Sequence, residues 1–499
     1  MSRKIIINRK EYETRVAYLE NDELVELFIE RKQESSLVGN IYKGVVTKVL
    51  PGMQAAFVDI GLEKAAFLYV ADIEGANDDF SHLIDGVNRD PEHSSTVELP
   101  CIDELVKVGD QLLVQISKEP ISTKGARITT YVTLPGRHLV LMPTINHVGI
   151  SRRIEREHER ERLRTILEAM RPAGVGMIAR TVAENKNADD LRADLDFLSG
   201  LWKTITQKNG GSVKAPALLY QDLDLTFKTM RDLFTREVDS LIVDDEGEYN
   251  RAREFAARLL PHLHDRIEHY RGKEPIFDAF NIEVEVAKIY SRKVWLKSGG
   301  YIVIDQGEAL TAVDVNTGRY VGKKNLEDTL LQTNLEAAKE IAYQLRLRNI
   351  GGIIIIDFID MEDEENRQRV VQALEHSLKI DRAKTNVLPF SELGLVEMTR
   401  KRVRDSLGRI LCEPCHYCEG KGFIKSPHTV CYEIFREIRR ISGVYRGKKL
   451  YVEAYSDIAD ILFSEAADYV ETLENDCDVK LVIKSNNHFH QEHYEIVPL

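Results

Sequence analysis

Gly351-Gly-Ile-Ile-Ile-Ile-Asp357-Phe-Ile-Asp360 is the most informative stretch of this 499-residue chain. Its four consecutive isoleucines predict a strand that is buried on both faces and therefore central in a covered sheet. Asp357 stands at the carboxyl end of that strand, which is where open α/β sheets bind their ligands. We expect a parallel α/β unit from about residue 282 to about residue 411, with a ligand site at Asp357.

A second strand-like stretch, Ala309-Leu-Thr-Ala-Val-Asp314-Val-Asn316, carries another acidic side chain. Side chains alternate between the two faces of a strand, so Asp314 and Asn316 point the same way. The strands of this unit are expected at 283–290, 301–305, 309–315 and 353–358, with a helix from Leu326 to Arg348 between the last two. If those two strands are neighbours, Asp314 and Asp357 come within reach of one ion.

Two carboxylates with no basic residue between them repel each other unless a cation neutralises them. Mg²⁺ prefers oxygen ligands and binds through one or two carboxylates together with phosphate. A water activated by Mg²⁺ would then attack a phosphodiester, and Asn316 would orient a carboxylate or the phosphate. The alternative is that both aspartates only cap helices or turns at the strand ends.

The segment Cys412-Glu-Pro-Cys415-His-Tyr-Cys418 contains the C-x-x-C spacing of a zinc knuckle. Tetrahedral zinc needs four ligands. Either Cys412 with His416 or His428 completes a site within one chain, or two chains each contribute Cys415 and Cys418 to a site between subunits. A redox C-x-x-C is a further alternative, although such motifs usually follow a strand and begin a helix.

Five strand-like segments with a long insertion predict an OB-type barrel. The segments are 38–50, 54–60, 64–70, 109–118 and 126–134, with the insertion at 73–104. Residues 72–104 hold ten acidic residues and one basic residue. Phe57 and Phe67, on successive strands, could stack on bases, with Lys118 and Lys124 near the phosphates. The alternative is that both phenylalanines belong to the barrel core.

The net charge of −13 argues against a general attraction to nucleic acid. The acidic insertion accounts for most of this excess, so an RNA-binding surface would have to be local. Arg180-Thr181, at the end of a predicted strand, offers a phosphate contact, although a solvated arginine is the simpler interpretation. The N-terminus lacks signal-peptide features and no apolar run reaches the roughly 18 residues of a membrane span, so a cytoplasmic location is expected.

Several blocks, in this order, resemble the catalytic half of the ribonuclease E/G family, and its short members most closely. The resemblance covers nearly the whole chain, and the blocks that carry it are Gln54–Gly61, Gly149–Ile154, Ala312–Asn316, Thr333–Ala338, Gly351–Met361, Gly394–Arg400 and the cysteine segment.

The resemblance implies a catalytic role for the paired aspartates. Asp314 and Asp357 would hold catalytic Mg²⁺, and Asn316 would assist at the scissile phosphate. The resemblance also implies that Phe57, Phe67 and Lys124 form the RNA-binding surface of an S1 domain.

A pocket for a 5′-monophosphate is implied at Arg180, Thr181 and the backbone of Val140. The family's further arginine in this pocket corresponds to Lys384 here, which keeps the charge but lacks the bidentate fork of a guanidinium. Cys415 and Cys418 would form the zinc link, and Cys412 is extra to the minimal pattern.

The implied fold class is a multidomain α/β and β protein. Three strands at 4–8, 13–19 and 24–30 would pair with a later part of the chain. The expected parts are an RNase H-like subdomain from 1–37 and 226–288, an S1 domain at 38–129, a 5′-sensor region at 130–225, a DNase I-like catalytic domain at 289–411, a zinc link at 412–425, and a small C-terminal α/β domain at 426–499.

The implied function is Mg²⁺-dependent endonucleolytic cleavage of single-stranded, A/U-rich RNA, stimulated by a 5′-monophosphate and leaving a 5′-phosphate and a 3′-hydroxyl. Ribosomal RNA 5′-end maturation and messenger decay are the expected processes. The expected assembly is a homodimer or a dimer of dimers, without the family's long scaffold tail. The alternative function is a non-catalytic S1-domain RNA-binding or ribosome-associated scaffold.

Overall fold

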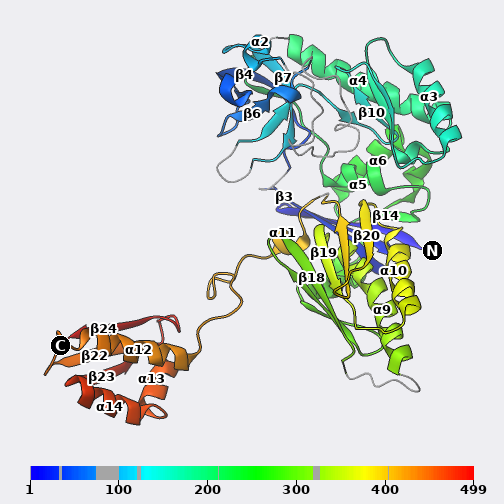
Figure 1. Ribbon diagram of the computed structural model, residues 1–499. Helices are drawn as coiled ribbons and strands as arrows, with labels where there is room; N and C mark the ends of the chain where they lie inside the picture. Colours follow the sequence, from blue (N-terminus) through cyan, green and yellow to red (C-terminus); the bar gives the residue numbers. More distant parts are fainter. Residues whose placement is uncertain are drawn as a thin grey trace. The chain divides into compact units, whose positions relative to one another are not determined.

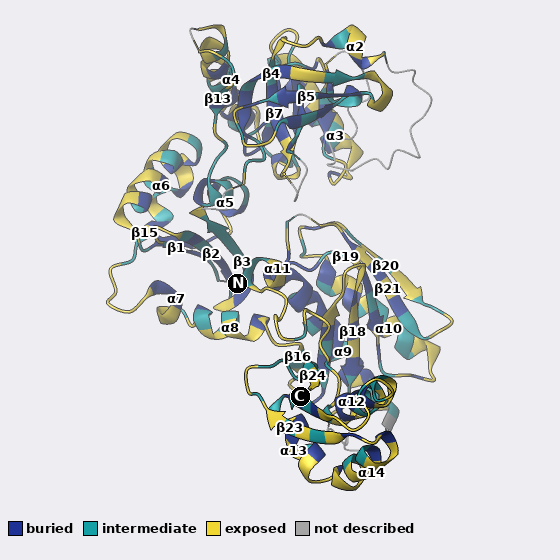
Figure 2. Cartoon of the chain, turned by 90° about the vertical axis from the view of Figure 1, so that its left-hand side faces the viewer, coloured by how far each residue is buried: buried dark blue, intermediate teal, exposed yellow. Residues whose placement is uncertain are grey.

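The computed structural model describes residues 2–32, 36–74, 100–120, 125–211, 213–318, 326–402 and 404–498. The chain forms two compact units, Met1–Ser406 and Leu407–Leu499 (Figure 1). Buried residues fill the interior of each unit, and the outward surfaces of the helices are exposed (Figure 2). Within these described ranges, no helix combines the length and the apolar composition needed to cross a membrane.

The three predicted N-terminal strands are confirmed, and they pair with a later part of the chain as expected. β1 runs antiparallel to β2 and parallel to β14, with Ile5 opposite Leu241. The sheet has the order β15-β14-β1-β2-β3, with β1 Arg3–Arg9, β2 Glu13–Glu20, β3 Glu23–Arg31, β14 Ser240–Val243 and β15 Ile267–His269. Helices α5 (Leu225–Leu233) and α6 (Glu246–Leu259) pack their buried side chains against it.

The predicted OB-type barrel is also confirmed. Strand β4 pairs with both β5 and β7, which closes the five-stranded barrel. Its strands are β4 Ile41–Leu50, β5 Ala55–Asp59, β6 Ala66–Tyr69, β7 Gln111–Lys118 and β8 Arg127–Thr129. Residues 75–99 of the insertion lie outside the described residues, and the short helix α2 (Ile102–Leu105) at its end buries Ile102 in the barrel core.

Along the chain, a small sheet with two helices follows the barrel strand β8 and precedes β14. The two helices are α3 (Glu157–Met170) and α4 (Ala188–Gly210). The sheet has the order β11-β12-β10-β9, with β9 Leu134–Pro135, β10 Leu139–Met142, β11 Val148–Ile150 and β12 Gly176–Ala179. The buried carboxylate of Asp194 on α4 accepts hydrogen bonds from the backbone of Arg137, His138 and Leu139.

The third large sheet has the order β16-β17-β18-β19-β21-β20 and differs from the parallel sheet that we predicted. Only β18 and β19 form a parallel pair; β17 and β21 run antiparallel to their neighbours. The strands are β16 Lys293–Trp295, β17 Tyr301–Gln306, β18 Leu310–Asn316, β19 Gly352–Asp357, β20 Thr385–Phe390 and β21 Leu395–Arg400.

The predicted burial of β19 on both faces is wrong. Ile354 and Ile356 are completely buried, whereas Ile353 is 52% exposed. Helices α9 (Leu326–Leu347) and α10 (Glu364–Leu378) pack together on one face of the sheet (Figure 1), where their buried side chains join those of the strands. The other face stays open, so a run of isoleucines here reflects β propensity as well as burial.

The predicted strand at 283–290 is also wrong, because this segment is helix α8 (Ile282–Ile289). Its alternation of apolar residues and glutamates imitates a strand. In the helix, Ile282 and Ile289 are seven residues apart and both are buried, whereas Val284 is exposed. Burial of one helical face therefore outweighs the apparent period of two.

Helix α9 also joins the third sheet to the N-terminal sheet. The guanidinium of Arg346 donates to the carboxylate of Glu26 on β3 at 3.0 Å, and both side chains are buried. The hydroxyl of Tyr343 donates to the carbonyl of Leu24 at 2.7 Å. These contacts fix the helix that lies beneath the open face.

The unit Leu407–Leu499 has its own core. Its sheet has the order β23-β22-β24, with β22 Lys449–Ala454, β23 Lys480–Ser485 and β24 Tyr494–Pro498. Cys431 and Cys477 are buried in this core. The helices that pack on this core are α12 Pro427–Ile441, α13 Ser456–Phe463 and α14 Ala467–Cys477.

Replacing Asp194 by alanine should lower the free energy of unfolding by about 3 kcal/mol, because three buried backbone N–H groups lose a charged acceptor. Urea unfolding followed by the fluorescence of Trp202, which lies on the same helix, measures this effect. The exposed Asp196 provides the control, and its change to alanine should alter the stability by less than about 0.5 kcal/mol. If both changes lowered the stability equally, the Asp194 carboxylate would not have the stabilising role given to it here.

Candidate active site

The structure brings Asp314 and Asp357 together. They are directly opposed residues of the parallel pair β18–β19, and both are exposed on the open face of the sheet. The predicted alternation of β18 is confirmed, since Val313 and Val315 are buried on the opposite face. The amide nitrogen of Asn316 donates to Oδ2 of Asp314 at 2.8 Å, so it orients that carboxylate.

The two carboxylates influence each other electrostatically. Burial raises the pKa of Asp357, and the negative charges of Asp314 and Asp360 raise it further. Asp360 was not among the predicted site residues, although it belongs to the same stretch of sequence. Repulsion among these carboxylates favours either a proton or a cation at this place.

A buried amide holds the loop that follows Asp357. The side chain of Asn334 on α9 donates to the carbonyl of Ile359 at 2.8 Å and accepts from its backbone N–H at 3.1 Å. Asn334 is completely buried. Sequence reasoning missed this residue, because its partner is 25 residues away along the chain.

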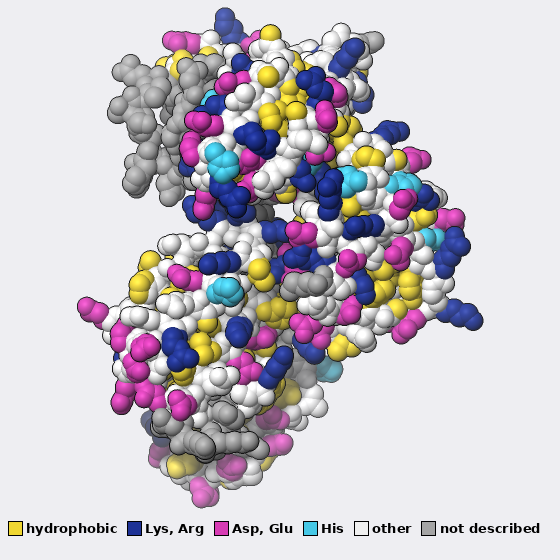
Figure 3. Space-filling model, turned by 90° about the vertical axis from the view of Figure 1, so that its right-hand side faces the viewer, with side chains coloured by type: hydrophobic (Ala, Val, Ile, Leu, Met, Phe, Trp, Pro, Cys, Tyr) yellow, Lys and Arg dark blue, Asp and Glu magenta, His cyan; other side chains and the backbone are white. Residues whose placement is uncertain are grey.

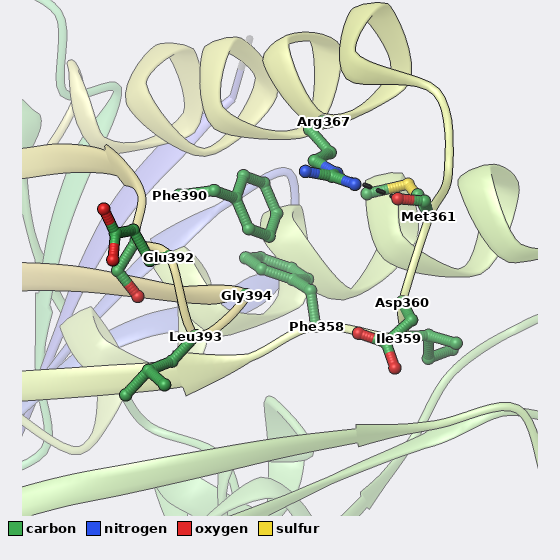
Figure 4. A pocket seen from close by; sticks show the side chains of 10 residues that line it. Phe358, Ile359, Asp360, Met361, Arg367, Phe390, Glu392, Leu393 and Gly394 are labelled. Carbon is green, nitrogen blue, oxygen red and sulfur yellow. Dashed lines mark hydrogen bonds between the residues drawn. The ribbon is translucent and has the colours of Figure 1, made fainter.

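A pocket of about 290 Å³ lies beside this loop, at the carboxyl end of β19. Figure 4 shows the rings of Phe358 and Phe390 at its centre, with Asp360 on one side and Glu392 and Leu393 on the other. The ring centroids are 6.0 Å apart. Asp360 and Glu392 stand at its margin, whereas neither Asp314 nor Asp357 lines it, so the pocket is a neighbour of the paired carboxylates and not their binding site.

On the barrel, Phe57 and Phe67 are directly opposed on β5 and β6, with ring centroids 5.9 Å apart. Both are half-buried and stand outside the barrel core, so the alternative that they are core residues is wrong. The exposed Lys118 on β7 lies opposite Arg127 on β8, and Arg127 in turn lies opposite Phe67 on β6. Lys124 lies outside the described residues.

Two basic residues of this barrel surface were not predicted. Lys48 is the register partner of Phe57, and Arg127 that of Phe67, so cations stand at both ends of the aromatic pair. Spacing along the chain does not reveal them, because they join the surface only through strand pairing. Basic and acidic side chains are interspersed over the face drawn in Figure 3, which allows such local basic surfaces in an acidic protein.

Arg180 is not a freely solvated side chain. Its guanidinium donates to the carbonyl of Gly136 at 2.6 Å and forms an ion pair with Asp232 at 2.8 Å. Burial alone would raise the pKa of Asp232, but hydrogen bonds and charge from Arg231, together with the charge of Arg180, outweigh it and lower the pKa. Arg180 is thereby held at one position.

The other predicted sensor residues lie around this position. The hydroxyls of Thr181 and Ser151 are 3.0 Å apart, and the guanidinium of Arg153 donates to the carbonyl of Arg382. Val140 is half-buried on β10, which pairs with β12 directly before Arg180. Lys384 is exposed and follows Arg382 by two residues, so a chain of contacts connects the Thr181 region with the segment that carries Lys384.

In the C-terminal unit, Cys415 and Cys418 form a tight turn. Hydrogen bonds to the Cys415 sulfur from the backbone of Cys418 and Tyr417 lower the pKa of this thiol, with a further contribution from the Cys418 side chain. The backbone N–H of Gly422 donates to Sγ of Cys418 at 3.3 Å. These bonds favour the thiolate, which is the form that binds metals.

One alternative was a zinc site completed by residues of one chain, and the described residues do not form such a site. Among the residues that the structure describes, no group of three His, Cys, Asp or Glu side chains is placed to hold one metal ion. His428 instead contacts Glu465 at 3.0 Å. The structure therefore groups Cys415 with Cys418 alone.

An OB-type barrel with cations beside paired aromatic rings, joined to a sheet with paired carboxylates, is the architecture of a multidomain nucleic-acid-processing protein. The sequence model of the Ribonuclease E/G family matches residues 133–403, and that of the RNase E/G thioredoxin-like domain matches residues 414–499.

Curated relatives agree with these matches over the full length. The chain is 45% identical to ribonuclease G of Salmonella typhimurium and to ribonuclease G of Escherichia coli, over 100% of both chains in each case. It is 35% identical to ribonuclease E of Escherichia coli, over 100% of this chain and 46% of that protein. The chain therefore belongs to the ribonuclease E/G family.

Replacing Asp357 by asparagine should raise the melting temperature slightly at neutral pH without divalent cations, because a like-charge repulsion is removed. The native pKa of Asp357 is raised, so its destabilising effect is complete above that pKa and absent below the unfolded-state value. The difference between the two proteins should therefore disappear on acidification. Calorimetry across pH tests this, and a variant that is less stable than the natural protein at neutral pH would contradict it.

Proposed function

We propose that this chain hydrolyses single-stranded RNA internally with the help of a divalent cation at Asp314 and Asp357. Membership of the ribonuclease E/G family makes it an endoribonuclease. The observation that carries the finer proposal is the direct pairing of the two aspartates on the exposed face of the sheet.

The donor set suits Mg²⁺. Asp314 and Asp357 provide carboxylate oxygens, which are the ligands that Mg²⁺ prefers. Desolvation raises the pKa of Asp357, and the charges of Asp314 and Asp360 raise it further; a bound cation would offset this charge repulsion. When bound, Mg²⁺ neutralises charge on the phosphate and lowers the pKa of the attacking water.

The chain's own residues position the reactants. Asn316 keeps the Asp314 carboxylate turned toward the site, and Asn334 fixes the loop after Asp357. Water attacks phosphorus in line with the departing 3′ oxygen; a new P–O bond forms, the P–O3′ bond breaks, and the oxygen takes up a proton. The products carry a 5′-phosphate and a 3′-hydroxyl.

The barrel accounts for a preference for single strands. Unpaired bases expose their faces for stacking on Phe57 and Phe67, while Lys48, Arg127 and Lys118 follow the backbone. Within a duplex the bases are already stacked on each other. A/U-rich segments, which pair weakly, would reach this surface most readily.

We also propose that Arg180, Thr181 and the backbone at Val140 bind a 5′-monophosphate and stimulate cleavage. Asp232 and Gly136 use part of the Arg180 donor fork, and the remaining N–H groups can serve a phosphate. Lys384 would add charge without a second fork, which implies a modest stimulation.

Cys415 and Cys418 fit half of a tetrahedral zinc site, since the surrounding N–H groups favour the Cys415 thiolate. Zinc held by two such pairs would join two chains as a structural link. A homodimer or a dimer of dimers follows from this proposal, and Cys412 is not required in it.

The finer fold assignments are proposals as well. The order β15-β14-β1-β2-β3, with three antiparallel strands followed by parallel ones, supports an RNase H-like subdomain. A mixed sheet with its site on an open face is compatible with a DNase I-like catalytic domain. Ribosomal RNA 5′-end maturation and messenger decay in the cytoplasm are the processes we propose.

Asp357→Asn should abolish Mg²⁺-dependent cleavage, with a loss of at least about 100-fold, because a group that stabilises transition-state charge is removed. RNA binding measured in EDTA should be unchanged or slightly stronger. The matched control is Glu397→Gln, which removes a charge from the adjacent strand β21 on the same face. An Asp357→Asn protein that still cleaves at the natural rate would refute the role of Asp357, and a natural protein that binds RNA but does not cleave it with Mg²⁺ would leave only the RNA-binding scaffold.

The double change Cys415→Ser and Cys418→Ser should halve the mass measured by light scattering and release bound zinc. Cys412→Ser is the control and should change neither quantity. Unchanged mass in the double variant would refute the intersubunit link.

A further inference from the structure

An aromatic pair, one ring exposed and the other half-buried, stands on the open face of the sheet that carries Asp314 and Asp357. Trp295 on β16 and Tyr301 on β17 are directly opposed, and their ring centroids are 5.4 Å apart. Trp295 is 64% exposed, although it is one of only two tryptophans in the chain. Its neighbour Val294 points to the other face and packs against the core, so packing alone explains Val294 and leaves Trp295 unexplained.

A cation accompanies the two rings. The ammonium group of Lys293 lies 4.1 Å from the centroid of the Trp295 ring and 3.5 Å from that of Tyr301. Lys293 and Trp295 are two residues apart on β16, so they share one face. Aromatic rings that stack on bases, with a cation that reaches the backbone, are the chemistry of single-stranded nucleic-acid binding.

Strand pairing places this group beside the paired carboxylates. Tyr301 is the register partner of Asn316, and Val303, which pairs with Lys293, is also the partner of Asp314. Neighbouring strands are about 4.8 Å apart. Trp295 therefore lies about 10 Å across the sheet from Asn316, on the same face, which is within reach of a nucleotide next to the scissile phosphate.

We infer that Trp295 and Tyr301 form a base-stacking subsite for a nucleotide flanking the scissile phosphate, with Lys293 supplying a cation for the backbone. This inference rests on the proposed function, since it assigns RNA to the open face. The subsite is separate from the barrel surface at Phe57 and Phe67. It would hold the RNA strand close to Asp314 and Asp357, running across the sheet from β16 toward β18.

Fluorescence in the full chain tests the subsite without cleavage. In a Trp202→Phe background, Trp295 is the only tryptophan. Adding a single-stranded oligonucleotide in EDTA should quench its emission, and an oligonucleotide with one abasic position at the stacked nucleotide should not. Unchanged Trp295 emission at saturating RNA would overturn the inference. Because EDTA excludes metal-dependent chemistry, this result is independent of whether Asp357→Asn abolishes cleavage.

Kinetics provide the second measurement. Trp295→Ala should raise KM about tenfold, the order expected when one stacked base is lost, while Trp295→Phe should retain most of the affinity. The same abasic substrate should remove the difference between Trp295→Ala and the natural protein. Tyr12→Ala, which removes another exposed aromatic ring in the turn between β1 and β2, is the control and should leave KM unchanged. A Trp295→Ala protein with unchanged KM but altered mass in light scattering would instead make this face a contact between copies of the chain.

Discussion

The structure depends on the register between two parallel strands. Because β18 and β19 align so that Asp314 faces Asp357, two like charges are held next to each other on an exposed face. A shift of one residue would turn one carboxylate into the core that α9 and α10 cover. The buried isoleucines of β19 and the buried Asn334 beneath the following loop oppose such a shift. The repulsion between the aspartates is thus maintained by packing elsewhere, which is the condition that the proposed cation site requires.

The same principle organises the barrel, where strand pairing assembles a surface from residues far apart in sequence. Lys48, Phe57, Phe67, Arg127 and Lys118 are successive register partners across five strands. None of these strands contributes more than one of them. Aromatic rings therefore stand between cations at a spacing fixed by the sheet, which suits a polymer with a charged backbone and stacking bases.

Local patterns in the sequence predicted the first three strands of the N-terminal sheet, the strands of the barrel, and the common face of Asp314 and Asn316, since alternation is a property of one strand. They failed where the outcome depends on distant partners. The isoleucines of β19 could not indicate whether one or two faces are covered, and the alternating segment 282–289 could not indicate that a helix buries its two end residues. Asn334, Lys48 and Arg127 join their sites only through tertiary contacts, so no spacing in the chain identifies them.

The departure from a parallel sheet has a functional consequence. A fully parallel sheet needs a crossover after each strand, and such crossovers usually cover both faces. Here β16, β17 and β18 are joined by antiparallel pairing, as are β20 and β21, so hairpins replace crossovers at both edges. The helices α9 and α10 lie together on one face, and the opposite face presents exposed side chains on several strands, among them Trp295, Asp314, Asp357 and Glu397. The single-stranded substrate that we propose would need such a surface rather than a closed pocket. The mixed topology, the half-exposed isoleucine and the exposed tryptophan are therefore consistent with one another: one face of the sheet forms the core, and the other presents the side chains of the proposed RNA site.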